Sequence, residues 1–147
     1  MEAFLALAVP MKPPPLRFSA DDIRRVKAAY GVTCGFCGPV VLAAISGEPL
    51  DTIMRFATNG KITAAEMRYA LFRLCLPLHG CGQTAPKHGL MVIDFNGPPT
   101  HWVCVSGGKL LDNHTVLAGR DWVSAREWSR LVQPKTNVTI REAIEVG

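Results

Sequence analysis

Cys37 and His101 lie far apart in the sequence, and their residue types are those of a nucleophile and its base. Cys37 stands directly before Gly38-Pro39 and the apolar run 40–45, with Gly47 after it. Proline in the first turn and glycine past the end predict a buried helix here. At a helix N-terminus, free N–H groups and the helix dipole favour a thiolate. Cys37 is therefore the candidate nucleophile.

His101 opens a stretch, 101–106, that predicts a strand, and Gly107-Gly108 predicts a tight turn into a return strand, 109–113. His101 then lies diagonal to Asp112 on one face of the sheet, because side chains alternate along strands. An Asp in this place orients an imidazole and stabilises its charged form. Cys37, His101 and Asp112 together predict an acyl-transfer triad. The turn predicts the pairs Ser106–Lys109, Val105–Leu110, Cys104–Leu111 and Val103–Asp112.

Other assignments stay open at these positions. A one-residue slip in register would make Asn113 the orienting residue in place of Asp112. His114 shares the predicted face and is an alternative base. Cys104 alternates away from His101, which predicts a core residue. Cys37 itself is either the nucleophile or a small buried residue at a helix start.

The predicted elements are helices followed by an antiparallel sheet, which indicates a single α+β domain over 17–147. Residues 1–16 form a Pro-rich extended arm, which packs either on its own domain or on a neighbouring protein. Ser19 with Asp22, and Thr63 with Glu66, predict capped helix starts. The remaining predictions are a helix at 51–56, a loop at 78–88, a strand at 89–95, a helix that Ser124 begins, and a short strand at 138–140.

Composition narrows the classes of function. The 147 residues carry a net charge of +4 without a dense basic run, so nucleic-acid binding is not expected. No apolar segment reaches the roughly 20 residues that span a bilayer. The stretch 3–10 lacks the basic start of a secretory signal, which indicates a cytoplasmic protein or one built into a virion or other assembly. Five cysteines, an odd number, argue against a disulfide scaffold.

The segment 34–37, Cys-Gly-Phe-Cys, resembles the sequence around the nucleophile of the papain family. The run from Cys37 to Gly47 is also similar to the Cys-Gly-Pro helix start of small bacterial and phage papain-like cysteine peptidases, relatives of the bacteriocin-leader-processing peptidases. In that group the base begins a strand, and an Asp or Asn follows on the next strand, as His101 and Asp112 do here. The resemblance implies a papain-like fold and a thiol protease or amidase that needs no cofactor or metal.

The sequence departs from the family pattern at the oxyanion site. Papain-like enzymes carry a Gln upstream of the nucleophile that donates to the oxyanion, and Gly31 stands at that position here. The backbone N–H of Cys37 is one available donor, and Tyr30 or Thr33 is the candidate for the second. Loss of one such donor typically slows catalysis by about 10²- to 10³-fold.

Two alternatives from other classes remain. Cys34-x-x-Cys37 has the spacing of a zinc knuckle, which Cys75, His79 and Cys81 would complete. The second alternative is a catalytically degenerate papain-like module that binds or assembles, with residues 1–16 gripping a protein partner. For the hydrolase, the expected substrates are peptides or peptidoglycan stem peptides. The sequence does not indicate which of these is cleaved, nor the host.

Overall fold

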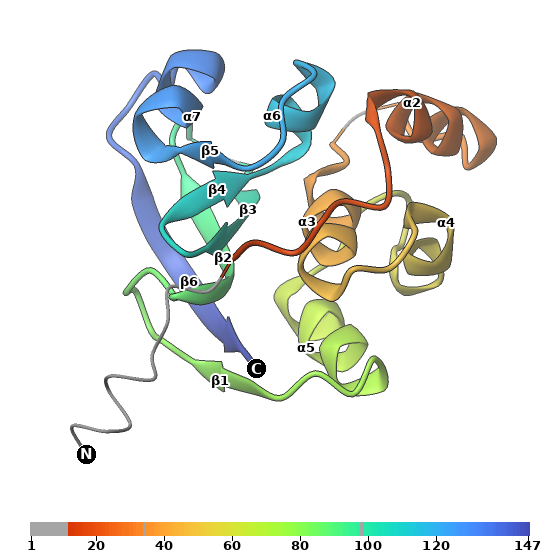
Figure 1. Ribbon diagram of the computed structural model, residues 1–147, viewed down its shortest axis with the longest axis horizontal. Helices are drawn as coiled ribbons and strands as arrows, with labels where there is room; N and C mark the ends of the chain where they lie inside the picture. Colours follow the sequence, from red (N-terminus) through yellow and green to blue (C-terminus); the bar gives the residue numbers. More distant parts are fainter. Residues whose placement is uncertain (1–11, 34, 98) are drawn as a thin grey trace.

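The computed structural model describes residues 12–33, 35–97 and 99–147. Helices fill the first half of the chain, and an antiparallel sheet with two further helices fills the second, which is the α+β arrangement predicted from the sequence (Figure 1). The helices are α2 (Ala20–Ala29), α3 (Cys37–Ser46), α4 (Leu50–Ile53), the 3-10 turn η1 (Met54–Phe56), α5 (Ala64–Arg73), α6 (Asn113–Leu117) and α7 (Ala125–Val132). The strands are β1 (Leu78–Gly80), β2 (His88–Asp94), β3 (His101–Ser106), β4 (Lys109–Leu111), β5 (Val123–Ser124) and β6 (Thr139–Val146). None of the helices described is long and apolar enough to cross a bilayer.

The helix starts follow the predicted caps. The Ser19 hydroxyl accepts the Asp22 backbone N–H, and the Ser19 backbone N–H donates to the Asp22 carboxylate. Thr63 and Glu66 form the same reciprocal capping box at α5. The Ser124 hydroxyl accepts a backbone N–H in the first turn of α7. Each cap satisfies donors that the first turn of a helix leaves without a partner.

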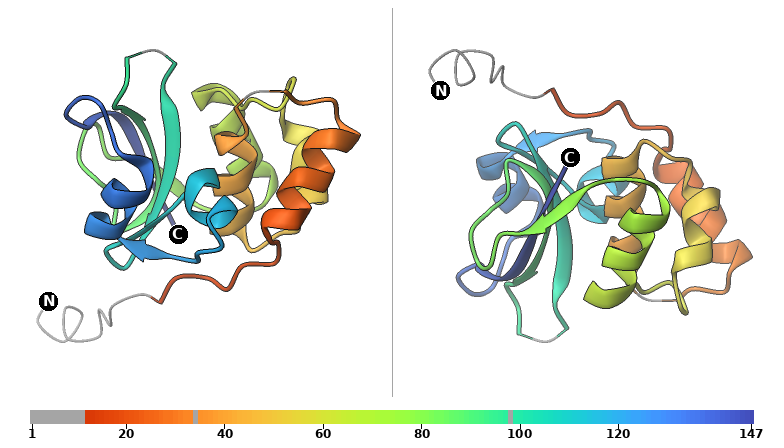
Figure 2. Two further views of the ribbon diagram at one scale, coloured as in Figure 1. Left: turned by 90° about the horizontal axis from the view of Figure 1, so that it is seen from above. Right: turned by 90° about the horizontal axis from the view of Figure 1, so that it is seen from below.

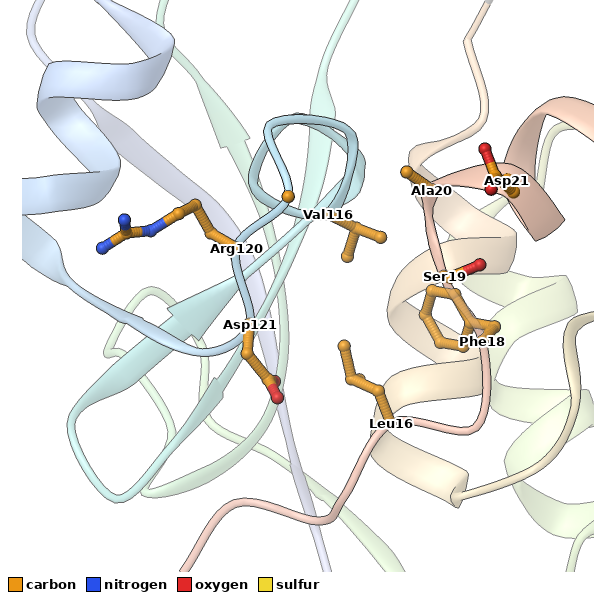
Figure 3. Close-up of a pocket in the computed structure, with 9 residues that line it drawn as sticks. Leu16, Phe18, Ser19, Ala20, Asp21, Val116, Arg120 and Asp121 are labelled. Carbon is orange, nitrogen blue, oxygen red and sulfur yellow. The ribbon is translucent and has the colours of Figure 1, made fainter.

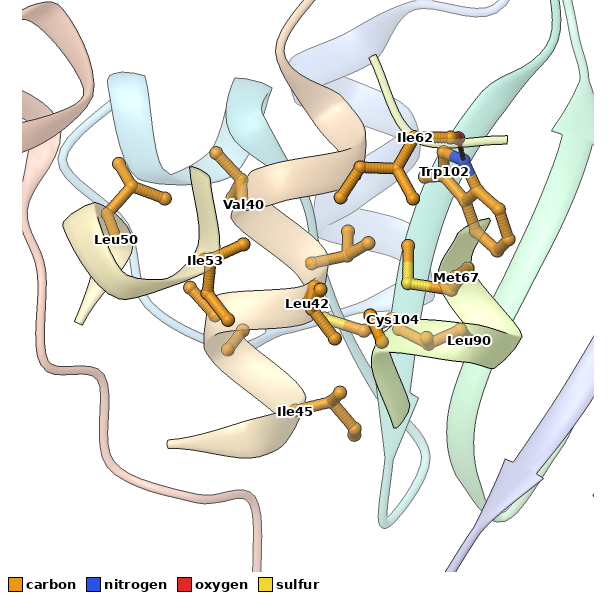
Figure 4. Packing of buried hydrophobic residues seen from close by; sticks show 14 of the residues in the cluster. Val40, Leu42, Ile45, Leu50, Ile53, Ile62, Met67, Leu90, Trp102 and Cys104 are labelled. Atoms are coloured by element: carbon orange, nitrogen blue, oxygen red, sulfur yellow. Dashed lines mark hydrogen bonds between the residues drawn. The ribbon is translucent and has the colours of Figure 1, made fainter. Parts of the chain in front are cut away.

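Helix α3 is the centre of the larger of two apolar clusters. Eight of its ten residues are buried, because the run 40–45 has no polar side. Helices α2, α4 and α5 surround it, and β3 lies against its other side (Figures 2 and 4). A smaller cluster around Met91, Val103 and Trp128 fills the other face of the sheet beneath α7. The sheet therefore has helices on both faces. Helix α3 is held against the sheet by apolar packing.

The sheet order is β1-β6-β2-β3-β4-β5. The turn at Gly107-Gly108 gives three of the predicted pairs, Ser106–Lys109, Val105–Leu110 and Cys104–Leu111. The predicted strand 109–113 is wrong in its last part, because it ends at Leu111 and Asp112 becomes the N-cap of α6.

Two other predictions are corrected at the opposite edge. Residues 78–80, predicted as loop, form β1, which pairs with the end of β6. Strand β6 is longer than the predicted 138–140 and lies between β1 and β2. Neither pairing could be found from local sequence, because the paired residues are more than forty positions apart in the chain.

The described end of the N-terminal arm packs on its own domain. The Trp122 indole N–H donates to the Pro14 carbonyl at 3.0 Å, and Phe18 is buried. Figure 3 shows Leu16 and Phe18 facing Val116 of α6 across a shallow pocket. Residues 1–11, the rest of the segment predicted to grip a partner, lie outside the described residues.

Candidate active site

Cys37 is the first residue of α3 and is half-buried. Phe36, the N-cap, is buried in the core and makes no side-chain hydrogen bond to the first turn of α3. The Trp102 backbone N–H points at Cys37 Sγ at 3.5 Å, and the Gly38 N–H also donates to it. A Cβ on Gly38 would lie 3.0 Å from Ile62, so a larger residue beside Cys37 would crowd the Ile62 side chain.

His101 is the first residue of β3, and its side chain is almost fully buried. His101 Nε2 lies 2.8 Å from Asp112 Oδ2. The geometry thus brings together the predicted base and the predicted orienting residue. Asp112 meets His101 from the N-cap of α6 rather than from the strand on which it was predicted.

Three groups hold the Asp112 carboxylate, which is fully buried. Besides His101, the Thr115 backbone N–H donates to Oδ1 at 2.9 Å, and the Trp128 indole N–H donates to Oδ2 at 2.6 Å. Trp128 lies in α7, the helix that Ser124 was predicted to begin. Its contact with Asp112 depends on how α7 docks, and nothing in the local sequence signals it.

The pKa values of the thiol and the imidazole move in opposite directions. Burial raises the pKa of Cys37, but its interactions with His101 and with two backbone N–H groups outweigh burial, and the pKa is lowered. Burial lowers the pKa of His101, but its bonds to Asp112 and Cys37 raise it to about 9. Burial likewise opposes ionisation of Asp112, while His101 and Trp128 hold its pKa below the ordinary value. Both shifts act in favour of the charged pair, thiolate and imidazolium.

Aromatic rings cover the polar groups of the site. Phe95 meets the His101 ring edge-on with centroids 5.3 Å apart, and it meets Trp128 in the same way at 5.9 Å. The Trp102 indole donates to the Ile62 carbonyl at 2.8 Å and is buried. This cover excludes water from the imidazole and strengthens its electrostatic contacts.

Cys37 lines two hollows at once. One, of ≈ 250 Å³, is bounded by Gly60, Ile62 and Trp102. The other, of ≈ 300 Å³, is bounded by Phe95, His101, Asn113 and His114. Because the Cys37 thiol has open space on two sides, it can reach a group in the middle of an extended bound chain.

The other predicted residues have different places. Asn113 and His114 line the second hollow, but Asp112, not Asn113, contacts His101. The ring of His114 is 5.2 Å from that of His101, and burial lowers the pKa of His114. Tyr30 and Thr33, the candidates for a second oxyanion donor, line neither hollow, and Tyr30 is 56% exposed.

The remaining cysteines are distributed through the fold. Cys104 is buried in the core, as predicted, and burial raises the pKa of its thiol. Cys37 packs against the larger cluster and Cys81 against the smaller one, on the other face of the sheet, while Cys75 is exposed. Among the described residues, which omit Cys34, no three His, Cys, Asp or Glu side chains gather closely enough to hold a metal ion.

Comparisons of the chain with protein families, with curated proteins and with solved structures found no match. The case for a function therefore rests on the residues themselves. Their strongest feature is the linked set of thiol, imidazole and buried carboxylate at the meeting of α3, β3 and α6.

Proposed function

We propose that the protein is a papain-like thiol hydrolase that cleaves amide bonds. One observation carries the proposal: Cys37, at the start of a buried helix, lines the same hollow as His101, an imidazole that is hydrogen-bonded to a buried carboxylate. Isolated cysteines and histidines are common, but this chain of contacts is what a nucleophile, its base and an orienting acid require.

The mechanism follows from the contacts. The Cys37 thiolate attacks the carbonyl carbon of the amide, and the carbonyl oxygen becomes an oxyanion near the uncapped first turn of α3, where the Cys37 N–H can donate to it. His101, already protonated, gives its proton to the leaving amine as the C–N bond breaks. Water then attacks the thioester, with His101 accepting its proton, and the acid product leaves with Cys37 restored.

Asp112 keeps His101 in the required orientation and favours its charged form. Because Oδ2 accepts from Nε2 of His101, the other ring nitrogen, Nδ1, is the one left to exchange a proton with the thiol. The thiolate–imidazolium pair persists between the lowered pKa of Cys37 and the value of about 9 for His101. Hydrolysis is accordingly expected over that pH range, falling off on both sides.

The test is alkylation of the folded protein by iodoacetamide across pH, read by peptide mass spectrometry. Exposed Cys75 serves as the control thiol in the same molecule. Below pH 7, Cys37 should react at least tenfold faster than Cys75, and His101→Ala should remove most of that advantage, because a thiol beside no imidazole returns towards its ordinary pKa. Equal rates at the two cysteines would contradict the proposal.

A catalytically degenerate papain-like module is the second candidate. It is favoured by one observation: neither Tyr30 nor Thr33 reaches the hollows beside Cys37, so the second oxyanion donor is not where the sequence placed it. Profiling with peptide mixtures and peptidoglycan stem peptides separates the two candidates. A reactive Cys37 that cleaves neither class at any pH would favour the module, in a virion or another assembly.

A further inference from the structure

The Asn113 side chain is the unusual polar group of this site. Its Oδ1 is the one buried side-chain oxygen or nitrogen without a hydrogen-bond partner among residues 12–33, 35–97 and 99–147. A buried polar atom without a partner costs about 1–3 kcal/mol of stability. Such an atom in a folded protein calls for an explanation, and a functional site is one of the common explanations.

The position of Asn113 supplies that explanation. The residue follows Asp112 directly and lines the hollow that also contains Cys37 and His101. The other carboxamide on this wall is already engaged, because Asn96 Oδ1 accepts the Lys135 backbone N–H at 2.6 Å. Asn113 is thus the carboxamide of the hollow that folding leaves unused.

We propose that Asn113 binds the main chain of a peptide substrate in the hollow beside His101. A peptide group presents one N–H and one C=O, and a carboxamide presents the matching acceptor and donor. Because Asn113 Oδ1 is buried, the side chain must turn towards the hollow for this oxygen to accept the N–H of the substrate. The substrate class this favours is an extended polypeptide, rather than a small amide that reaches only Cys37. The inference rests on the proposed function, since it gives Cys37 a substrate to attack.

Asn113 acts by touching the substrate, not by orienting the base. Asp112 already fills the orienting role, with its carboxylate bound to His101 Nε2. Replacing Asn113 should therefore leave the reactivity of the thiol towards a minimal reagent unchanged. It should weaken only the reaction with reagents that extend a peptide main chain into the hollow.

The experiment compares two reagents on the full chain: iodoacetamide, which has no peptide main chain, and an epoxysuccinyl dipeptide amide. The second-order rate of Cys37 modification is measured for each by peptide mass spectrometry, together with the melting temperature. The variants are Asn113→Leu, which keeps the approximate shape without polar atoms, and Asn113→Ala. Gln83→Leu is the matched control, because it removes an exposed carboxamide that lines neither hollow.

We expect both Asn113 variants to lose about three- to tenfold in rate with the epoxysuccinyl peptide, the loss typical of one neutral hydrogen bond. Their iodoacetamide rates should match wild type, and the melting temperature of Asn113→Leu should be unchanged or higher, because no orphan oxygen remains. An unchanged epoxysuccinyl rate overturns the inference alone. An equal loss with both reagents also overturns it, by making Asn113 structural. A wild-type Cys37 no faster than Cys75 with iodoacetamide overturns the proposed function itself.

Discussion

The proposed nucleophile and the proposed base are held in place by different forces. Helix α3, which carries Cys37, is buried over eight of its ten residues and has no side-chain hydrogen bond at its N-cap. The corner that carries His101 and Asp112 is held by hydrogen bonds, three of which converge on one carboxylate. Packing places one half of the site, and polar contacts place the other.

The difference has a consequence for pH. The apolar side chains packed around α3 carry no charge, so their contribution to stability is nearly constant with pH. The contacts of His101 and Asp112 depend on their charges and change as either group titrates. The two halves should therefore respond differently to substitution and to pH.

Asp112→Asn should have the largest effect. It removes the charged partner of a buried imidazole, and breaking a buried pair in this way typically costs about 3–5 kcal/mol. The folded pKa of His101 is about 9, above its ordinary 6.5, so the stability its charge contributes is complete below 6.5 and is lost as pH rises through about 9. The stability gap between wild type and Asp112→Asn should thus be wide at about pH 6 and narrower at about pH 9.5.

Urea unfolding at the two pH values measures this gap. The stability that the Asp112 carboxylate adds is present above its ordinary pKa of 3.8 and is lost only as pH falls through its lowered folded value, so it is complete at both pH values chosen. A gap of the same size at both would show that Asp112 acts by packing or capping alone. The comparison between the two halves would then fail.

Leu42→Ala tests the packed half. Leu42 lies in the middle of α3 and is fully buried, so truncation should cost about 2–5 kcal/mol through lost burial and the cavity left behind. This loss should be nearly equal at the two pH values, in contrast to Asp112→Asn. Leu131→Ala, on exposed α7 surface, is the control and should change stability little. A clearly pH-dependent loss in Leu42→Ala would mean that α3 and the charged pair are coupled.

The same contrast explains what the sequence could reveal. The apolar run after Cys37 is a local pattern, and so are the capping pairs at Ser19 and Thr63, and all three became helices as predicted. The Gly107-Gly108 turn set the register that brings His101 near Asp112.

Local sequence patterns could not predict contacts between segments that are far apart in the chain. Asp112 was predicted at the end of a strand, but its side chain caps a helix. The error arose because a strand end and a helix N-cap have similar local sequences in a short segment. Strand β6 and the contact from Trp128 arise from segments that only the assembled sheet brings together. The identities of the three candidate site residues could thus be inferred from sequence, but the groups that support them could not.

Trp128→Phe should reduce stability less than Asp112→Asn or Leu42→Ala. It tests how much one hydrogen bond to Asp112 contributes to the polar half of the site. The phenyl ring keeps most of the packing beside Phe95 but loses the N–H donated to Asp112 Oδ2. Loss of a hydrogen bond to a charged group typically costs about 1.5–3 kcal/mol. The carboxylate keeps two donors, so Cys37 should still be alkylated rapidly below pH 7, within a few-fold of wild type.

Trp122→Phe is the matched control. It removes an indole hydrogen bond to an uncharged acceptor, the Pro14 carbonyl of the arm. Its stability loss should be smaller, about 0.5–1.5 kcal/mol for a neutral hydrogen bond, with no change at Cys37. If Trp128→Phe instead abolishes the rapid alkylation while Trp122→Phe does not, the indole of Trp128 is what orients Asp112. The polar half of the site would then depend on the docking of α7, and packing would place the base as well as the nucleophile.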